Sequence, residues 1–158
     1  MAHKAKTAPI LVPVDFSAYS VAALEWAADM AARLGAPLVV LHVVHDPGEA
    51  PGYYAIKGRK KHLRRLEDVA RELMDRFMTQ AHRRHPDNRP MRRAQTRVVV
   101  GLPVTRILEV ADRLQPLMIV MGSRGRSALA RMLLGSTAEN VARLSPVPVT
   151  LVKSRYKD

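Results

Sequence analysis

The chain has 158 residues, of which 47% are hydrophobic and none is cysteine, and its formal net charge is +12. This length and hydrophobic content suit one domain with a buried core, and the absence of thiols excludes disulfide frameworks, thiolate catalysis and cysteine-ligated zinc. The N-terminal segment lacks the apolar region of a secretory signal, and no run approaches the ~20 apolar residues of a membrane span, so we expect a cytoplasmic protein that does not enter membranes.

Apolar runs and helical patterns alternate along the chain. The runs are short, rich in β-branched residues and nearly continuous, as in parallel strands that are buried on both faces. They span 10–14, 37–44, 97–100, 117–121 and 147–152. The helical patterns span 17–34, 59–84 and 103–114, and a last one begins at 136. This alternation predicts an open, mostly parallel α/β sheet with helices on both faces. We expect one domain over 9–153, with flexible termini at 1–8 and 154–158.

Particular residue types mark the ends of these elements. Pro13 would remove a hydrogen-bond donor from the middle of a strand, so we expect it at the end of the first strand, where the chain turns toward a ligand. Ser17 and Gly35 are typical of the start and the end of a helix, and Pro103 is typical of a first helical turn.

The helical pattern at 59–84 lies in a strongly basic segment. Between Lys57 and Arg97 there are 14 Lys and Arg residues and 5 Asp and Glu residues. Apolar residues recur there at spacings of three and four, which predicts an amphipathic helix. They are Leu63, Leu66, Ala70, Leu73, Phe77 and Ala81. The charges then form the solvated face of this helix or, alternatively, the 57–97 surface binds nucleic acid or an acidic protein.

Three glycines return within the connection that follows the fourth apolar run, at Gly122, Gly125 and Gly135. Glycine weakens helices and strands, so this clustering indicates a backbone that bends sharply or approaches another group closely. Ser136 followed by Glu139 matches a capping box, which predicts a helix N-terminus whose free N–H groups suit a phosphate. A helix cap beside a tight turn explains the same pattern without a ligand. The lysine of a P-loop and a complete dinucleotide fingerprint are missing.

The predicted topology brings three of these features to one place. Ligands of open α/β sheets bind outside the carboxyl ends of the strands, at the point where the strand order reverses. Asp15 ends the first predicted strand, the glycine-rich connection leaves the fourth, and Ser136 begins the last helix. We therefore expect these segments to meet at a phosphate-binding edge of the sheet.

The glycine pattern also resembles a known family. Gly122-x2-Gly125-x9-Gly135-Ser136-Thr137 is similar to the ATP-binding signature of universal stress proteins. The resemblance covers about residues 9–153: "ILVPVDFSAYSVAALEWA" resembles the family's opening strand, aspartate and first helix, and "MIVMGSRGRSALARMLLGSTAENVARLSPVPVTLVK" its closing half. It implies a Rossmann-like fold of five parallel strands in the order 3-2-1-4-5, with an ATP site between the first and fourth strands.

The same resemblance implies roles for individual residues. The nucleotide-binding residues would be Pro13, Val14, Asp15, Val43, Met121, Gly122, Gly125, Gly135, Ser136 and Thr137. The first four would contact the adenosine, with the Asp15 carboxylate holding the ribose or the adenine and the Val43 backbone contacting the adenine. The next two would lie along the ribose, Gly125 would lie near the phosphates, and the last three would seat the phosphate chain. Mg²⁺ would be held mainly by phosphate oxygens and water, without a metal site made by the protein.

Other candidate residues have two interpretations. Arg124, Arg126 and Arg131 could neutralise phosphate charge, or they could be solvated loop residues. His42 lies inside an apolar strand, where we expect a hydrogen-bonded core histidine rather than a ligand. The remaining histidines show no spacing typical of a metal site.

The expected site lacks an obvious base for ATP hydrolysis. Asp15 is the obvious carboxylate there, and the resemblance places it beside the nucleoside. We therefore expect no catalytic residues, and a nucleotide-dependent stress-response or signalling regulator with little or no hydrolysis. An adenylate-forming enzyme of related fold is disfavoured, because no second motif of that class is present. The alternative function is a basic interaction module that uses the 57–97 surface.

The last strand suggests a partner. In a sheet of order 3-2-1-4-5 the strand at 147–152 lies at an edge, and an exposed apolar edge favours pairing with another copy. The family resemblance implies a homodimer through this strand. Pro146, Pro148 and Lys153 could instead protect the edge from pairing.

Overall fold

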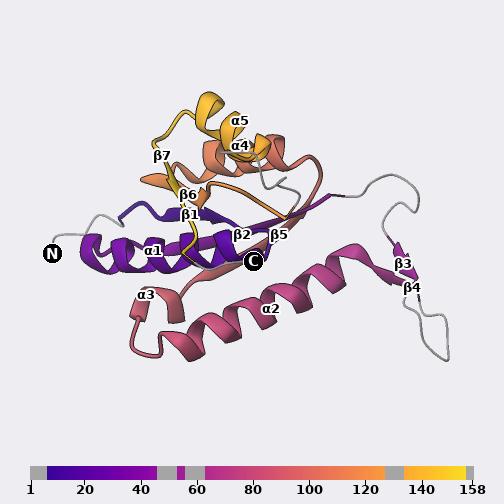
Figure 1. The fold of residues 1–158 in the computed structure, drawn as a ribbon, viewed down its shortest axis with the longest axis horizontal. Helices are drawn as coiled ribbons and strands as arrows, with labels where there is room; N and C mark the ends of the chain where they lie inside the picture. The colour runs from indigo at the N-terminus through magenta and orange to yellow at the C-terminus, as the bar shows by residue number, and fades with distance from the viewer. Residues whose placement is uncertain (1–6, 46–52, 56–62, 127–133, 156–158) are drawn as a thin grey trace, which may run out of the picture.

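Five parallel strands form the central sheet. They are β1 (Ile10–Pro13), β2 (Leu38–Val44), β5 (Gln95–Val100), β6 (Met118–Gly122) and β7 (Val149–Val152). The computed structural model describes residues 7–45, 53–55, 63–126 and 134–155, so most of both predicted flexible termini lies outside the described residues. The strands are arranged β5-β2-β1-β6-β7 (Figure 1). Counting these five strands alone, this is the predicted order 3-2-1-4-5, and the Rossmann-like α/β architecture is confirmed.

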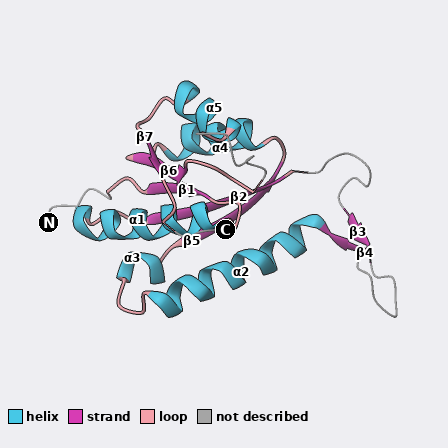
Figure 2. Ribbon diagram, in the orientation of Figure 1, coloured by secondary structure: helices cyan, strands magenta, loops and turns pink. Residues whose placement is uncertain are grey.

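Helices cover both faces of the sheet, as predicted (Figure 2). They are α1 (Ala18–Leu34), α2 (Leu66–Arg84), α3 (Arg89–Arg92), α4 (Pro103–Leu114) and α5 (Ser136–Leu144). The first three lie on one face and the last two on the other. Strand β1 contributes to both cores: Ile10 and Val12 pack on the side of α1 and α2, and Leu11 packs on the side of α4 and α5. This two-sided burial explains why the strand is a continuous apolar run.

Strand β1 lies at the centre of the sheet, and the strand order reverses beside it. Ile10 pairs with Leu38 of β2 on one side and with Met118 of β6 on the other. From β1 the chain crosses through α1 to β2, whereas from β5 it crosses through α4, on the opposite face, to β6. The carboxyl ends of β1 and β6 therefore form the switch point at which sheets of this kind bind ligands.

The predicted ends of three elements are confirmed. Pro13 is the last residue of β1. The Ser17 hydroxyl caps α1 by accepting a hydrogen bond from the Ser20 N–H (3.2 Å). Gly35 ends α1 in the left-handed conformation, with a φ of 63°, which a residue with a Cβ adopts at a cost. Helix α4 has the predicted bounds and begins at Pro103.

The basic helix begins later than predicted. Instead of 59–84, α2 spans Leu66–Arg84, and residues 59–62 lie outside the described part of the chain. Just before the helix, β4 (Leu63–Arg65) pairs antiparallel with β3 (Tyr53–Ala55), at the end of α2 that extends beyond the sheet (Figure 1). Residues 63–65 therefore form a strand with β3, although their apolar spacing predicts that they belong to the helix.

The buried face of α2 matches the predicted stripe at Leu66, Ala70, Phe77 and Ala81 and differs from it at position 73. Leu73 is 39% exposed, whereas Met74 is only 1% exposed. The predicted stripe also includes Leu63, which lies in β4 instead of the helix. The residues that α2 buries are Leu66, Ala70, Met74, Phe77, Met78 and Ala81.

Both edge strands differ from their predicted bounds. Strand β5 begins at Gln95 rather than at 97, because Gln95 and Thr96 pair with Val39 and Val40 of β2 although their side chains are exposed. Because these two residues have polar side chains, they do not belong to the apolar run from which the sequence predicts the strand. Strand β7 begins at Val149 rather than at 147. Pro148, just before it, has no backbone N–H to donate to a ladder.

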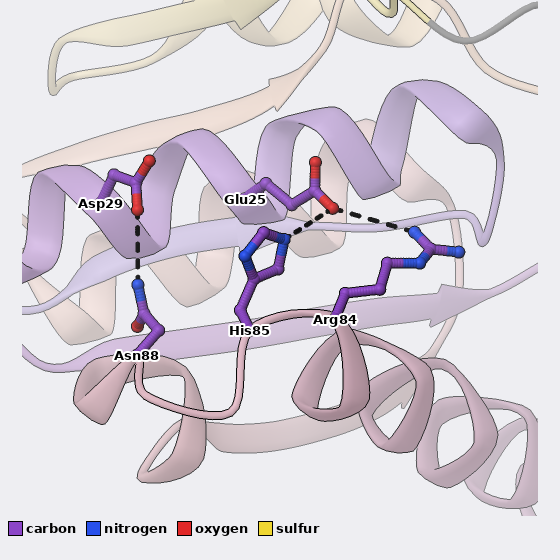
Figure 3. A network of polar contacts seen from close by, with 5 residues as sticks. All are labelled: Glu25, Asp29, Arg84, His85 and Asn88. Carbon is purple, nitrogen blue, oxygen red and sulfur yellow. Dashed lines mark hydrogen bonds and ion pairs between the residues drawn. The ribbon is translucent and has the colours of Figure 1, made fainter.

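Polar side chains attach the turn between α2 and α3 to α1 (Figure 3). His85 Nε2 lies 2.9 Å from Glu25 Oε1, and Arg84 Nη1 lies 3.8 Å from the same oxygen. The Asn88 side-chain amide donates to Asp29 Oδ1 (3.4 Å). These contacts join segments that are about 60 residues apart in the sequence.

Candidate functional site

The carboxyl ends of β1 and β6 border a cavity of about 280 Å³. All ten residues that the family resemblance assigns to nucleotide binding line this cavity. They are Pro13, Val14, Asp15, Val43, Met121, Gly122, Gly125, Gly135, Ser136 and Thr137. The fold therefore gathers residues from β1, β2, β6 and α5 at the switch point, where the topology predicts a ligand site.

Five further residues line the cavity, and none of them was predicted as a site residue. They are Ser20, Leu41, Pro103, Ile107 and Ala138. The apolar ones have the spacing of ordinary core residues, so their sequence carries no functional signal. Ser20 does carry one, because it is the polar residue on a face of α1 that otherwise buries alanine and leucine.

Hydrogen-bond donors from two segments that are far apart in the sequence hold the Asp15 carboxylate. Its Oδ1 accepts hydrogen bonds from the Ser17 N–H (3.1 Å) and the Ser20 hydroxyl (2.7 Å), at the start of α1. Its Oδ2 accepts one from the Arg126 N–H (2.8 Å), which is 111 residues away in the sequence. The Asp15 N–H donates to the Ser20 oxygen (2.8 Å). The carboxylate therefore joins the start of α1 to the loop that leaves β6.

These hydrogen bonds decide the charge state of Asp15. Burial raises the pKa of the carboxyl group, because a charged group is less stable away from water. Hydrogen bonds from Ser17, Ser20 and Arg126 favour the ionised form and outweigh burial, so the pKa lies below its ordinary value. Asp15 is therefore ionised at neutral pH.

The glycines of the signature approach other parts of the protein closely. A Cβ on Gly122 would lie 2.6 Å from the Tyr19 Cβ in the first turn of α1, and a Cβ on Gly125 would lie 2.5 Å from Asp15 Oδ2. At Gly135 the nearest atom would be the Arg124 Cα, at 3.3 Å. The predicted close approach is confirmed, and the partners in this structure are α1, the Asp15 carboxylate and the β6 loop.

The start of α5 differs from the predicted capping box. Gly135, not Ser136, is the N-cap residue, and Ser136 is the first residue of the helix. The Gly135 N–H donates to the Ser123 carbonyl (2.8 Å), and its own carbonyl accepts from the Glu139 N–H (2.9 Å). These two bonds hold Gly135 at the cap position, where it offers no side-chain acceptor to the first N–H groups of the helix. The positive end of the α5 dipole therefore adjoins the cavity.

The charged residues around the cavity are mostly cationic. Arg124 and Arg126 line it, whereas Arg131 lies outside the described residues. Asp15 is the acidic residue among the lining residues. Across the described ranges, no three His, Asp or Glu residues gather so as to hold a metal ion, and no helix is long and apolar enough to span a membrane.

His42 lies behind the cavity as a hydrogen-bonded histidine, as predicted. Its Nδ1 lies 2.8 Å from the Val14 carbonyl oxygen, and its ring centroid lies 4.3 Å from that of Phe16. Burial lowers the pKa of His42 and outweighs the opposite effects of the Val14 carbonyl and Asp15. Phe16 has a φ of 66°, a conformation that costs energy for a bulky residue. Its packing on His42 and Phe77 helps to hold this turn.

Comparisons with known proteins bear on the family of this chain. The model of the universal stress protein family matches residues 7–153. A universal stress protein of Mycolicibacterium smegmatis is 33% identical over 147 residues, which cover 93% of this chain and 46% of the relative. The chain thus spans about half the length of the curated relatives that it matches.

Two similar solved structures contain adenine nucleotides. A universal stress protein in complex with cAMP is 26% identical, with a TM-score of 0.66 and an alignment that covers 95% of this chain and 99% of that one. The universal stress protein from Archaeoglobus fulgidus in complex with dAMP is 25% identical, with a TM-score of 0.60 and coverage of 94% and 99%. Sequence, topology and the family match over nearly the whole chain lead to one conclusion: this chain belongs to the universal stress protein family.

Proposed function

We propose that the cavity between β1 and β6 binds ATP, and that the protein is a cytoplasmic, nucleotide-dependent stress-response or signalling regulator with little or no ATP hydrolysis. The observation that carries this proposal is one cavity in which an apolar wall, two arginines and the start of α5 meet. Each part suits a different part of a nucleotide.

The apolar wall suits the nucleoside. Leu41, Val43, Ile107 and Met121 line the cavity, and side chains of this kind bury the faces of a planar base. The complexes of similar universal stress proteins with cAMP and dAMP support an adenine nucleotide as the ligand.

Other lining residues suit phosphates. Ser136 and Thr137 are the first residues of α5, where unpaired N–H groups and the helix dipole favour an anion. Arg124 and Arg126 add two cations beside them. A Mg²⁺ ion would be held by phosphate oxygens and water, since the lining residues offer it few carboxylates.

The proposal of little hydrolysis rests on Asp15. It is the acidic residue among those that line the cavity, and three donors already hold its carboxylate. With its pKa below the ordinary value, it is a weak base for activating water. A single-turnover assay with hydrolysis on the order of 1 per second, as in kinases, would contradict this part of the proposal.

The test of ATP binding uses a charge at the start of α5. Ser136→Asp adds a carboxylate that suits the helix dipole and therefore keeps the helix, but it places a negative charge at the proposed phosphate position. Ser136→Asn is the matched neutral control. Two like charges about 4 Å apart repel by about 4 kcal/mol at an effective dielectric constant of 20, so we expect ATP to bind to Ser136→Asp at least ~10-fold more weakly.

Calorimetric titration of ATP with Mg²⁺ into nucleotide-free protein measures the effect. Equal affinity of the wild type, Ser136→Asp and Ser136→Asn for ATP would contradict the proposed phosphate position. Absence of ATP binding by the wild type would contradict the proposed function itself. Gly135→Val separates these outcomes less well, because its Cβ would lie 3.3 Å from the Arg124 Cα and would disturb the loop.

We also propose that two copies pair through β7. This strand is at the edge of the sheet, and its four residues, Val149–Val152, are only half-buried although the sequence is mostly apolar. Pairing would satisfy the free backbone groups of the edge. Light scattering at micromolar concentration is expected to give twice the chain mass, and a 17.6 kDa species would contradict the dimer.

A second candidate function uses the basic surface. Arg83, Arg89, Arg92 and Arg93 are exposed around the end of α2 and α3, and they form no ion pair with a described residue, whereas Arg71 and Arg84 do. This arrangement favours a polyanion such as nucleic acid. Fluorescence anisotropy with a labelled DNA duplex tests it: binding should weaken steeply with salt and should fall in Arg89→Gln/Arg92→Gln, but not in the control Arg113→Gln on α4. An acidic polypeptide that competes equally well would favour an acidic protein partner instead.

A further inference from the structure

We infer that Phe16, His42 and Phe77 form an aromatic clamp behind the cavity, and that through this clamp α2 positions the turn of residues 14–16 for nucleotide binding. The inference rests on the proposed function. It concerns three positioning residues, none of which is among the described residues that line the cavity. The turn keeps the contacts with adenosine that the family resemblance implies, and the clamp decides how firmly the turn is held for them.

The first observation concerns the backbone of Val14, which lines the cavity just after the end of β1. Its N–H donates to the Leu41 carbonyl (2.8 Å), and its own carbonyl accepts a hydrogen bond from His42 Nδ1 (2.8 Å). A carbonyl oxygen can only accept, so Nδ1 carries the hydrogen of the neutral ring. Strand β2 therefore holds Val14 by one main-chain group and one side chain.

The second observation is the backbone conformation of Phe16. Its φ of 66° lies in the left-handed region, which is costly for a bulky residue, so contacts elsewhere must hold it there. The ring centroid of Phe16 lies 4.3 Å from that of His42 and 5.5 Å from that of Phe77. These ring contacts are favourable and help to offset the cost of the turn.

The third observation links α2 to the cavity. Phe77 is a residue of α2, is 8% exposed and belongs to the same core cluster as Val14, and Phe16 packs against this cluster. The described lining residues include none from α2. The contact between Phe77 and Phe16 therefore gives this helix a route by which it acts on the site.

The affected part of the cavity is the part that the family resemblance assigns to adenosine. The turn carries Val14 and Asp15, whereas Ser136 and Thr137, assigned to the phosphates, belong to α5. When only a fraction of the molecules has the binding conformation, the affinity falls by that fraction. Loss of the clamp should therefore weaken the binding of adenosine and of ATP by the same factor.

The variant Phe16→Gly removes the ring contacts without straining the turn, because glycine adopts a positive φ readily. We expect it to bind both ATP and adenosine at least about fivefold more weakly than the wild type, in calorimetric titrations of nucleotide-free protein. Wild-type affinity for both ligands would overturn the inference, because the turn would then need no clamp. A loss confined to ATP would also overturn it, since the clamp would then act on the phosphates.

The variant Phe77→Leu carries the test to α2. We expect it to bind both ligands at least about threefold more weakly, at a temperature where the protein is fully folded. Leu38→Val is the matched control, because Leu38 packs in the same core cluster but pairs with Ile10, at the other end of β1 from the turn. Equal affinities of the two variants for ATP would overturn the role of α2.

A double-mutant cycle checks that Phe77 acts through Phe16. In the Phe16→Gly background the ring contact is already lost, so adding Phe77→Leu should change ATP affinity less than about twofold. If the two losses multiply instead, Phe77 acts by another route and the clamp is wrong.

A further measurement does not depend on a nucleotide. The Val14 N–H donates to the Leu41 carbonyl (2.8 Å), and at the other end of β1 the Ile10 N–H donates to the Pro37 carbonyl (2.9 Å). In the free Phe16→Gly protein, NMR should show hydrogen exchange of the Val14 amide that is at least about tenfold faster than in the wild type, relative to the Ile10 amide. Unchanged relative exchange would overturn the clamp. If the wild type binds no ATP while this exchange rises as expected, the proposed function fails and the clamp stands.

Discussion

Two carboxylates, Asp15 just before α1 and Glu25 within it, each hold a distant segment of the chain against this helix. Asp15 accepts hydrogen bonds from backbone N–H groups and a hydroxyl, and it holds the β6 loop. Glu25 lies beside two basic side chains, Arg84 and His85, and it holds the turn that follows α2 (Figure 3). The two attachments differ in the chemical groups that form them.

The difference lies in what each attachment fixes. A backbone N–H has a position set by the chain, so its bond to Asp15 fixes the path of the loop. Arg84 and His85 have long or rotatable side chains that are more than 40% exposed, and ion pairs of this kind contribute little and are screened by salt. The site region should therefore be the more sensitive to single substitutions.

The largest expected effect comes from the close contact between β6 and α1. In Gly122→Ala the new Cβ would lie 2.6 Å from the Tyr19 Cβ and 3.0 Å from its carbonyl carbon, so strand and helix must separate. We expect a loss of about 2–3 kcal/mol in the free energy of unfolding, measured by urea denaturation. Gly135→Ala is the control, with a nearest contact of 3.3 Å and a smaller loss. Equal losses in the two variants would show that the close contact with α1 does not cause the loss of stability.

The next effect is that of Asp15 on stability and its dependence on pH. At pH 7 we expect Asp15→Asn to lose about 1–3 kcal/mol, since several donors lose their charged acceptor. The folded pKa of Asp15 lies below its ordinary value of 3.8. Its stabilisation is therefore fully present above pH 3.8 and is lost as the pH falls through the folded pKa. In denaturation curves, the difference in free energy of unfolding between wild type and variant should become smaller below pH 3.8. A difference that stays constant down to pH 2 would contradict this assignment.

A smaller effect is expected from His42. Its folded pKa lies below its ordinary value of 6.5, so the folded protein resists protonation of this ring. The associated stability is present above pH 6.5 and is lost as the pH falls toward the folded pKa. His42→Gln should remove that part of the pH dependence and about 1 kcal/mol of hydrogen bonding to the Val14 carbonyl. The two proteins differ at this residue alone, so the difference between their pH profiles isolates His42.

The smallest effect should be that of Glu25. We expect Glu25→Gln to lose less than ~1 kcal/mol at physiological salt, and the loss should vanish near 1 M salt because the contacts are partly exposed. Urea denaturation at both salt concentrations measures it. A loss larger than that of Asp15→Asn at pH 7 would reverse the comparison between the two carboxylates.

The sequence predicts most of the fold because the strands are buried on both faces. A strand such as β1, whose residues serve both cores, has few polar interruptions, and α4 has proline and apolar spacing that mark its bounds. The predicted strand bounds are wrong where a residue belongs to a strand only because another strand lies beside it in the fold. Gln95 and Thr96 belong to β5 because β2 lies beside them, and Leu63 joins β4 because β3 does.

The sequence predicts which residues line the cavity, but it does not predict the hydrogen bonds between them. The signature spacing identifies residues that the fold brings to one cavity. Spacing alone cannot show that the Arg126 N–H donates to Asp15, since these residues are 111 positions apart. The spacing also predicts the N-cap of α5 one residue too late, at Ser136, because the hydrogen bond between Gly135 and Ser123 decides where α5 begins. The roles of individual residues toward a nucleotide stay predictions for the experiments above.

The central position of β1 has a consequence for synthesis on the ribosome. Ile10 pairs with Met118, and at about 5–20 residues per second the second residue is added roughly 5–20 s after the first. Until then β1 can pair with β2 alone, and the wall of the cavity formed by α5 does not yet exist. A nucleotide that binds as proposed can therefore favour folding only after most of the chain has been made. During translation, the emerging strands must stay protected from aggregation without help from the ligand.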